Sequence, residues 1–327
     1  MIARLLRCLS PLLLIVGCGL TQAQMQADGL PPMTLQTVGR DVYFVQGLPG
    51  VASSANAGFN SNAGAVATGA GLVVFDSLGS PALADKFIRL VQTASGERVK
   101  LVVVSHYHAD HFYGLQSLLG PGVEVMAHPK ALSVFQSDNT AQRLAQRKQD
   151  LFPWVNEQTR LIAPTRVAKV DGQQAERLQV GRYHFTLLDG RSGHAEDDLM
   201  MRIDELGVLF TGDLFFTGRL PFVGNADPND WLRAIDNMML QTPKVAIPGH
   251  GPISYNPAQD IALTQRYLKF LGQAMAKAVS EMQTFEEAYA STDWSDFKDL
   301  PAFEAANKLN AYGAFVNAEK DVLKSGK

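Results

Sequence analysis

The chain has 327 residues, of which 46% are hydrophobic and 19% are charged, and its formal net charge is -3 at pH 7. This is an ordinary globular composition, and the length allows one large α/β domain with an extension, or two domains. The sequence has no basic block and no alternation of basic and aromatic residues, which excludes nucleic acid as an expected partner.

The first residues predict a targeting segment. Arg4 and Arg7 precede an apolar run over residues 9–16, which is too short to span a bilayer as a mature helix. Residues 15–18 (IVGC) resemble a bacterial lipobox, in which Cys18 would be lipidated and become the mature N-terminus. Ordinary signal cleavage, for example after Ala23, is the competing interpretation. Both predict an exported, periplasmic protein, and the first adds a lipid anchor in the bacterial membrane.

Both cysteines, Cys8 and Cys18, belong to this segment or its edge. The mature protein is therefore expected to have no disulfide, no thiolate zinc ligand and no cysteine nucleophile. Its stability then depends on its hydrophobic core, which the length permits.

A flexible spacer over residues 22–33 leads into alternating strands and helices. Ser80 followed by Pro81 predicts a helix start and Gly96 its end, with apolar residues at helical spacing between them. Glycines at residues 69–71 predict the turn of a hairpin. The expected elements of this part are a strand at 41–46, hairpin strands at 62–68 and 72–75, a helix at 80–96 and a strand at 100–104.

Three histidines and an aspartate follow that last strand in the stretch VVVSHYHADHFYG, residues 102–114. The β-branched run predicts a buried strand, which a serine ends. In an extended loop His106 and His108 point the same way, and Asp110 and His111 follow within a turn. Neutral imidazoles and a carboxylate at this spacing suit zinc. A polar turn without metal is the alternative, and four potential ligands opening directly from an apolar strand argue against it.

Short strands and helices repeat after this motif. A polar helical segment at 130–150 ends in the apolar run 151–154 (LFPW), which is either a lid over a pocket or a helix end pinned to the surface by Phe152 and Trp154. Two capping boxes predict helix starts at Asn256 and Thr284. The remaining expected elements are a short helix at 115–119, strands at 124–127, 167–170, 176–180, 183–188, 199–203, 208–211 and 244–247, and helices at 227–238 and from about 302.

Three further candidate ligands lie on strand-end loops beside glycine, namely His194, Asp213 and His250. Glycine lets the backbone and a ligand approach closely. Together with the HxHxDH motif, these residues predict two histidine-rich sites.

Other polar residues have a plainer interpretation. His128 and His184 lie on or beside predicted strands without a glycine-flanked loop, and we interpret them as structural. Residues 196–198 (EDD) form either a solvated turn or a hydrogen-bond partner of a ligand histidine. Arg219 either contacts a substrate anion or pairs with a nearby carboxylate.

The order of these pieces resembles the metallo-β-lactamase superfamily. The matching pieces are Asp76 after the hairpin, HxHxDH at 106–111, GH at 193–194, TGD at 211–213 and PGHG at 248–251. The resemblance implies an α/β fold, a four-layer αββα sandwich over residues 34–255, between a signal segment at 1–23 and a C-terminal helical extension at 256–327 packed on the domain.

The resemblance also implies a dinuclear zinc site. It would place His106, His108 and His194 on one zinc and Asp110, His111 and His250 on the other. Asp213 would bridge both ions, and Asp76 would orient the ligand loop.

The function that the resemblance implies is hydrolysis. A metal-bound hydroxide would attack an ester, thioester or amide-like bond of a small-molecule substrate, with Asp110 and Asp213 in catalytic roles. Asp213 looks like the bridging residue of glyoxalase II and related hydrolases, whereas residues 193–196 (GHAE) depart from the usual GHTPGS. The chain looks most like exported members grouped with sulfur-oxidation or quinoprotein systems.

Two alternatives use the same fold. One is a β-lactamase, and the other is an iron-dependent oxidoreductase similar to persulfide dioxygenases, which would use His106, His108 and Asp213. The full ligand set favours two zinc ions over iron or manganese. Oligomeric state is left open.

Overall fold

The computed structural model describes residues 29–324 and residue 326. The predicted targeting segment, with Cys8, Cys18 and Ala23, lies outside the described residues. Among the helices of the described part, none has both the length and the apolar character needed to cross a membrane.

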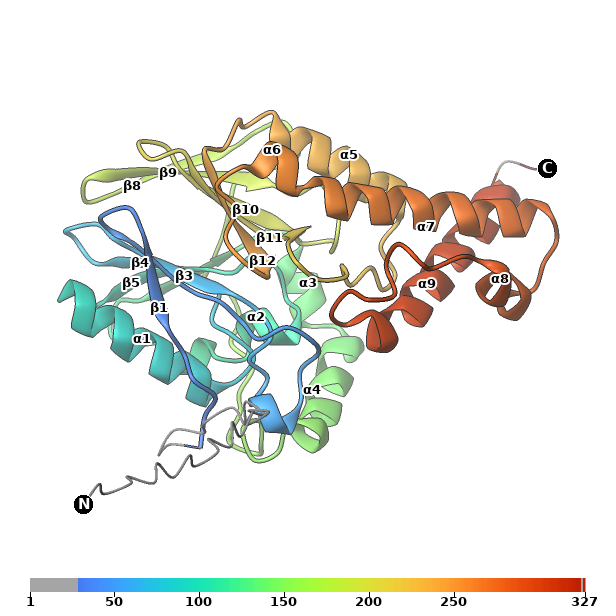
Figure 1. Ribbon diagram of the computed structural model, residues 1–327. Helices are drawn as coiled ribbons and strands as arrows, with labels where there is room; N and C mark the ends of the chain where they lie inside the picture. Colours follow the sequence, from blue (N-terminus) through green and yellow to red (C-terminus); the bar gives the residue numbers. More distant parts are fainter. Residues whose placement is uncertain (1–28, 325, 327) are drawn as a thin grey trace, which may run out of the picture.

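Two β-sheets form the centre of the molecule (Figure 1). The first has seven strands in chain order, and the second has five strands in the order β12-β11-β10-β9-β8. The strands of the first sheet are β1 (Leu35–Val38), β2 (Val42–Val45), β3 (Ala63–Ala67), β4 (Leu72–Phe75), β5 (Val99–Val103), β6 (Glu124–Ala127) and β7 (Arg166–Val167). Those of the second are β8 (Glu176–Val180), β9 (Tyr183–Asp189), β10 (Leu199–Ile203), β11 (Val208–Phe216) and β12 (Val245–His250).

The central strands of each sheet, such as β3, β4 and β11, are buried on both faces, which explains their near-continuous apolar sequences. On β5, Leu101 and Val103 belong to the core between the sheets, whereas Val102 packs in the core under α1 (Pro81–Ser95). A third core lies between the second sheet and the helices α5 (Pro228–Met239) and α7 (Ala262–Ser280). Three cores between four layers make an αββα sandwich (Figure 1), which confirms the predicted fold class.

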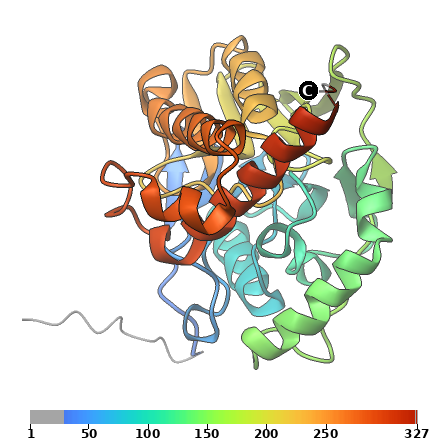
Figure 2. The ribbon, with the colours of Figure 1, turned by 90° about the vertical axis from the view of Figure 1, so that its right-hand side faces the viewer.

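The C-terminal helices are α6 (Pro257–Asp260), α7, α8 (Phe285–Ser291) and α9 (Phe303–Lys324), and the capping box at Thr284 is present as predicted. Of these helices, α6 and the start of α7 lie over the second sheet, whereas α8 and α9 lie at one end of the sandwich (Figure 1). Figure 2 shows α9 at the same end as α4 (Asp138–Asp150). The division into domains at residue 255 stays a prediction.

A buried polar side chain connects α9 to the loop after β11. Asn310 accepts a hydrogen bond from the backbone N–H of Val223 at 2.8 Å and donates to the carbonyl of Pro221 at 2.8 Å. Its amide also donates to the hydroxyl of Tyr267 on α7 at 2.9 Å. The C-terminal helices therefore hold the loop over residues 217–226 in place.

Several local predictions are wrong. The spacer is not flexible throughout, because Leu30 and Met33 are buried against the first sheet. Asn256 forms no capping box, since its amide bonds the side chain of Gln259 at 2.8 Å and no side-chain bond caps the backbone. The helical segment at 130–150 is two helices, α3 (Ala131–Phe135) and α4, because Ser137 caps a new start.

The apolar run 151–154 is not pinned by both aromatic residues. Phe152 is 65% exposed, whereas the indole of Trp154 donates to the carbonyl of Ser54 at 2.8 Å and Leu151 is buried. The strand predicted at 208–211 continues as β11 to Phe216, since its parallel pairing with β12 resumes after an irregularity at Gly212. Asp213 therefore lies inside a strand.

Candidate metal centre

The structure brings all seven predicted ligands together from four separate parts of the chain. His106 and His108 lie in the loop after β5, and Asp110 and His111 lie on the short helix α2 (Ala109–Phe112). His194 lies between β9 and β10, Asp213 on β11 and His250 at the end of β12. Their ligand atoms form two groups, each within 4.8 Å: the first group is His106, His108, His194 and Asp213, and the second group is Asp110, His111 and His250.

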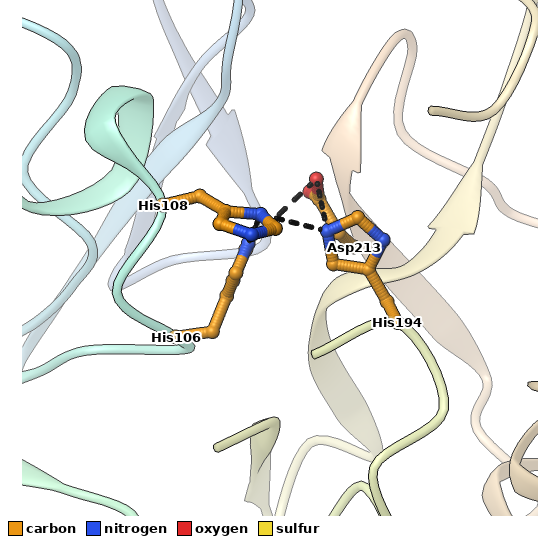
Figure 3. A group of neighbouring side chains, drawn as sticks. All are labelled: His106, His108, His194 and Asp213. Atoms are coloured by element: carbon orange, nitrogen blue, oxygen red, sulfur yellow. Dashed lines mark hydrogen bonds and ion pairs between the residues drawn. The ribbon is translucent and has the colours of Figure 1, made fainter. Parts of the chain in front are cut away.

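In the first group the nitrogen atoms of three imidazoles converge (Figure 3). Nδ1 of His108 lies 2.9 Å from Nε2 of His106 and 3.0 Å from Nε2 of His194. Oδ2 of Asp213 lies 3.4 Å from Nε2 of His194. Three nitrogens and one carboxylate oxygen are a donor set that suits zinc.

In the second group, Oδ2 of Asp110 lies 3.4 Å from Nε2 of His250 and 3.9 Å from Nε2 of His111. Asp213 reaches this group as well, with Oδ1 at 3.2 Å from Nε2 of His111 and Oδ2 at 3.3 Å from Nε2 of His250. Its carboxylate therefore lies between the two groups.

A glycine makes room for this carboxylate. A Cβ atom on Gly249 would collide with Oδ1 of Asp213 and with the backbone of Gly212. Gly212 itself has φ of 53°, in the left-handed region. The two glycines that the sequence places beside the ligands thus allow β11 and β12 to approach at Asp213.

Asp76 orients one histidine of each group. Its Oδ2 lies 2.8 Å from Nδ1 of His111 and accepts a bond from the hydroxyl of Ser105 at 2.8 Å, and that hydroxyl lies 2.9 Å from Nδ1 of His106. Because the serine donates to Asp76, it accepts from His106, so both histidines carry a proton at Nδ1 and turn Nε2 to the centre. Asp76 adopts φ of 63°, which an aspartate tolerates better than most residues.

Asn60 supports the second group, and the sequence analysis did not single it out. Its amide donates to Oδ2 of Asp110 at 2.8 Å, and its backbone carbonyl accepts from Nδ1 of His250 at 2.6 Å. The hydrogen bond to the carbonyl leaves Nε2 of His250 free. The run of asparagine and serine at 60–62, directly before β3, was the available signal.

Of residues 196–198, only Glu196 is exposed to solvent, whereas Asp197 and Asp198 are buried. Asp198 accepts bonds from the backbone N–H of His194 at 2.6 Å and of Ala195 at 2.8 Å. Asp197 accepts from the backbone N–H of Tyr107 at 3.0 Å. The two carboxylates therefore position ligand loops through the backbone rather than through an imidazole.

Burial makes the three histidines of the first group neutral. It lowers the pKa of His106 and of His108 well below the usual value and lowers the pKa of His194 to about 4. A neutral imidazole is the form that binds a metal ion.

His111 in the second group behaves in the opposite way. Burial opposes its charge, but the carboxylates of Asp213, Asp110 and Asp76 outweigh this and raise its pKa well above the usual value. Burial likewise opposes the ionisation of Asp110, but His111 and His250 lower its pKa to about 2. This group therefore holds an ion pair with a proton on His111.

Two buried atoms at the centre lack hydrogen bonds within the described part of the chain. They are Nε2 of His111 and Oδ1 of Asp213, which face each other at 3.2 Å without hydrogen-bond alignment. Buried polar atoms are rarely left without a partner. A metal ion that replaces the proton of His111 would satisfy both atoms, so the residues fit metal ions.

A cavity of about 210 Å³ opens over the two groups. His108, Asp110, Asp213 and His250 line its base. Its walls come from α4, from the loop after β11 and from Ala306 on α9, and their larger side chains are Arg143, Arg147, Leu151, Arg219 and Phe222.

Arg219 forms no ion pair with any carboxylate of the described residues, and it is buried. Its Nη1 donates to the carbonyl of Gly50 at 2.8 Å, and its guanidinium lies over the ring of Phe216 at 5.9 Å from the centroid. The predicted carboxylate partner is therefore absent at contact distance, and Arg219 adds positive charge to the cavity wall.

The two remaining histidines lie apart from the ligand groups. His128 lies 3.6 Å from a carboxylate oxygen of Asp189, and His184 bonds Glu205 at 2.6 Å on the surface. Neither belongs to a ligand group of the described residues, which agrees with their structural interpretation.

Comparison with known proteins gives one family. The family model described as "Metallo-beta-lactamase superfamily" matches residues 56–250. The chain is 26% identical over 198 residues to a "Metallo-beta-lactamase type 2" of Bacillus sp. (strain 170), a match that covers 59% of this chain and 67% of that protein. A protein of the same name from Bacillus cereus is 25% identical over 198 residues, which cover 59% of this chain and 68% of that protein.

Solved structures share the fold. The sec-alkylsulfatase Pisa1 from Pseudomonas sp. has a TM-score of 0.67 at 18% identity, and the match covers 87% of this chain and 50% of the alkylsulfatase. A metallo-beta-lactamase from Pontibacter korlensis has a TM-score of 0.55 at 18% identity, and the match covers 73% of this chain and 99% of that protein. The chain thus spans half the length of the alkylsulfatase and nearly all of the second protein's length.

Proposed function

The chain belongs to the metallo-beta-lactamase superfamily, and on that premise we propose that it is a dinuclear zinc hydrolase of small molecules with an ester, thioester or amide-like bond. The observation that carries the proposal is the position of Asp213. Its carboxylate lies between two groups of ligand atoms, within 3.4 Å of His194 and within 3.3 Å of His111 and His250. One shared carboxylate between two nitrogen-rich groups is the arrangement that a pair of neighbouring divalent ions needs.

In this proposal His106, His108 and His194 would hold one ion and Asp110, His111 and His250 the other, with Asp213 shared. When bound, the two zinc ions supply Lewis-acid polarisation of the scissile group and activation of water at neutral pH. Iron or manganese in the same ligands is the less favoured alternative, because nitrogen-rich sites with few carboxylates suit zinc.

The residues of the chain then hold the site and its charges. Asp76 and Asn60 fix the imidazoles of His111 and His250 with Nε2 inward. Asp110 is ionised, since its pKa is about 2, and its side chain is 21% exposed toward the cavity. An ionised carboxylate at this edge would accept a hydrogen bond from a substrate group and hold it in position.

Metal content and activity test the proposal together. The mature protein, stripped with a chelator and reloaded with zinc, is expected to bind close to two zinc ions per chain by mass spectrometry. It is also expected to hydrolyse members of a panel of chromogenic esters and thioesters only when reloaded. One iron per chain, with oxygen uptake on a persulfide substrate and no hydrolysis, would establish the alternative oxidoreductase.

β-Lactam hydrolysis is a second candidate. It is supported by the two Bacillus relatives, which carry the name metallo-beta-lactamase at 26% and 25% identity. The chain has Asp213 in the shared position and its two cysteines lie only at Cys8 and Cys18, so a cysteine-ligated variant of the site is excluded. A chromogenic cephalosporin added to the same panel separates this activity from ester hydrolysis.

The proposal places the enzyme outside the cytoplasm. The basic residues, apolar run and Cys18 of the N-terminal segment support export to the periplasm with a lipid anchor. Labelling of cells with radioactive palmitate, followed by recovery of the intact chain and of Cys18→Ser, tests the anchor: only the chain with Cys18 should carry label.

A further inference from the structure

The strongest unexplained feature is the positive charge on the cavity wall. Among the described residues that line the cavity, three are arginines, Arg143, Arg147 and Arg219, and only Asp110 and Asp213 of the ligand groups are acidic. With two divalent ions in the ligand groups, the two carboxylates would be more than neutralised. The cavity would then attract anions and repel cations.

Arg143 and Arg147 are arranged as one face of α4. Arg143, Arg147 and Leu151 follow each other at intervals of four residues, a spacing that places side chains on the same side of a helix. All three line the cavity. The stripe therefore presents two guanidinium groups and then an apolar side chain to the same space.

The two guanidinium groups are available for a ligand. Among the described residues, no carboxylate lies within 4.0 Å of Arg143, and Arg147 has only a loose contact of 3.7 Å with Asp150. Both side chains line the cavity that also contains ligand residues of the two groups, such as His108 and Asp110. An arginine without a carboxylate partner in a cavity wall is a typical site for an oxyanion.

Part of the cavity lining is apolar and partly exposed. Phe222 is 39% exposed and Val51 is 47% exposed, and both line the cavity with Leu151. Exposed apolar side chains around a cavity contribute to the binding of an apolar part of a ligand. The cavity of about 210 Å³ limits this ligand to a small molecule.

We propose that the substrate is a small amphipathic anion, with a carboxylate or sulfate group held by Arg143 and Arg147 away from the scissile bond and an apolar body between Leu151 and Phe222. This inference rests on the proposed hydrolase function for the reacting end of the substrate. It adds a specificity site on α4 that belongs to neither ligand group. Arg219, which also lines the cavity, adds to its positive charge.

Matched esters test the position of the anion. 4-Nitrophenyl pentanoate and the 4-nitrophenyl monoester of glutarate have the same acyl length, and they differ in a terminal methyl against a carboxylate. The zinc-loaded protein is expected to hydrolyse the glutarate monoester with a kcat/KM at least about tenfold higher, and this preference should weaken with added salt. 4-Nitrophenyl sulfate tests the alternative that the anionic group is itself the group that reacts, rather than a group held away from the scissile bond.

The double variant Arg143→Gln/Arg147→Gln removes the two charges and keeps long, helix-compatible side chains. It is expected to raise KM for the glutarate monoester about tenfold and to change kcat/KM for the pentanoate less than about twofold. The matched control is Arg266→Gln/Lys269→Gln, which removes two exposed charges from α7, away from the cavity, and should change neither substrate. Thermal unfolding of both variants checks that the fold is retained.

A binding measurement separates this inference from the hydrolase proposal. By calorimetry on the zinc-loaded protein, hexanoate is expected to bind at least about tenfold more tightly than neutral hexanamide, and the double arginine variant should lose this difference. Hexanoate binding that depends on the arginines without hydrolysis of any ester would reject the hydrolase and keep the anion site. Three results would overturn the anion site. The protein could hydrolyse both esters with equal kcat/KM, or the double variant could slow both esters equally. The third result is a dependence on the arginines that is confined to 4-nitrophenyl sulfate.

Discussion

The two ligand groups share Asp213 but differ in charge. The first group surrounds it with His106, His108 and His194, whose pKa values are lowered by burial. The second contains the carboxylate of Asp110 beside His111, whose pKa is raised by three carboxylates after these outweigh burial. A metal ion can enter the first group without displacing a proton, whereas in the second it must displace the proton of His111. Two neighbouring sites of similar geometry are therefore expected to bind zinc with different pH dependence.

The largest effect is expected from the residue that both groups share. Asp213→Ala should reduce kcat/KM by at least about a thousandfold and lower the zinc content from two to one or fewer, because both ions lose a ligand. Zinc analysis with ester kinetics provides the measurement. Asp236→Ala, which removes an exposed carboxylate on α5, is the matched control and should behave as the unaltered protein. Two zinc ions retained by Asp213→Ala would refute its shared position.

Variants that leave only one of the two groups able to bind zinc test the difference in pH dependence directly. His250→Ala should leave one zinc in the first group, and His194→Ala should leave one in the second, each with about a hundredfold lower kcat/KM. In the first case zinc affinity should stay constant between about pH 6 and pH 8, since the pKa of His194 is about 4 and the histidines are already neutral.

In His194→Ala, the direction in which zinc affinity changes with pH follows from the raised pKa of His111. Below that pKa a proton competes with zinc, so the apparent affinity of His194→Ala should rise about tenfold per pH unit until the pH passes the pKa of His111. Calorimetry in buffers of different ionisation enthalpy should detect about one proton released per zinc for His194→Ala and none for His250→Ala. Equal proton release in both variants would remove the difference between the groups.

A smaller effect is expected from the residue that orients one histidine in each group. Asp76→Asn should weaken zinc binding about 10- to 100-fold at both groups, because it alters the support of His111 and, through Ser105, of His106. Asparagine tolerates the left-handed φ of 63° at this position, so the backbone should be retained. Ser105→Ala should weaken only the first group, which competition with a chromogenic chelator can resolve. If Ser105→Ala lowered zinc affinity at both groups as Asp76→Asn does, Ser105 would act on more than His106.

The smallest effect concerns the second group alone. Asn60→Ala removes the bond from its amide to Asp110 but keeps the backbone carbonyl that holds His250. The loss should be about 1 kcal/mol in zinc affinity, or roughly fivefold. Gln149→Ala, on the exposed side of α4, is the control and should leave the affinity unchanged. An effect of Asn60→Ala on the first group would contradict its position.

Local patterns predicted most of the fold. Pro81 and Gly96 bound α1, and the Gly-rich turn joins β3 and β4, because these residues have backbone preferences that hardly depend on the rest of the chain. The prediction was wrong where two local patterns competed. At Asn256 the side chain bonded Gln259 instead of the helix N-terminus, and at residues 197–198 acidic side chains were buried because they accept hydrogen bonds from ligand loops.

The sequence by itself determined which residues are available for chemistry. The spacing of His106, His108, Asp110 and His111 is local, and the glycines beside His194, Asp213 and His250 mark each place where the backbone must come close. All seven residues meet in the structure, while their role as metal ligands stays a proposal.

Only the tertiary structure decided what surrounds these ligands. Residues distant in the chain are brought together by the hydrogen bond of Asn60 to Asp110, by the bonds of Asn310 to the loop after β11, and by the cavity that Arg143 and Phe222 both line. Such contacts depend on how layers pack against each other, and packing leaves no periodic signal in a single sequence. For this reason the sequence predicts the reacting groups, whereas the charge and shape of the cavity that selects a substrate emerge from the fold.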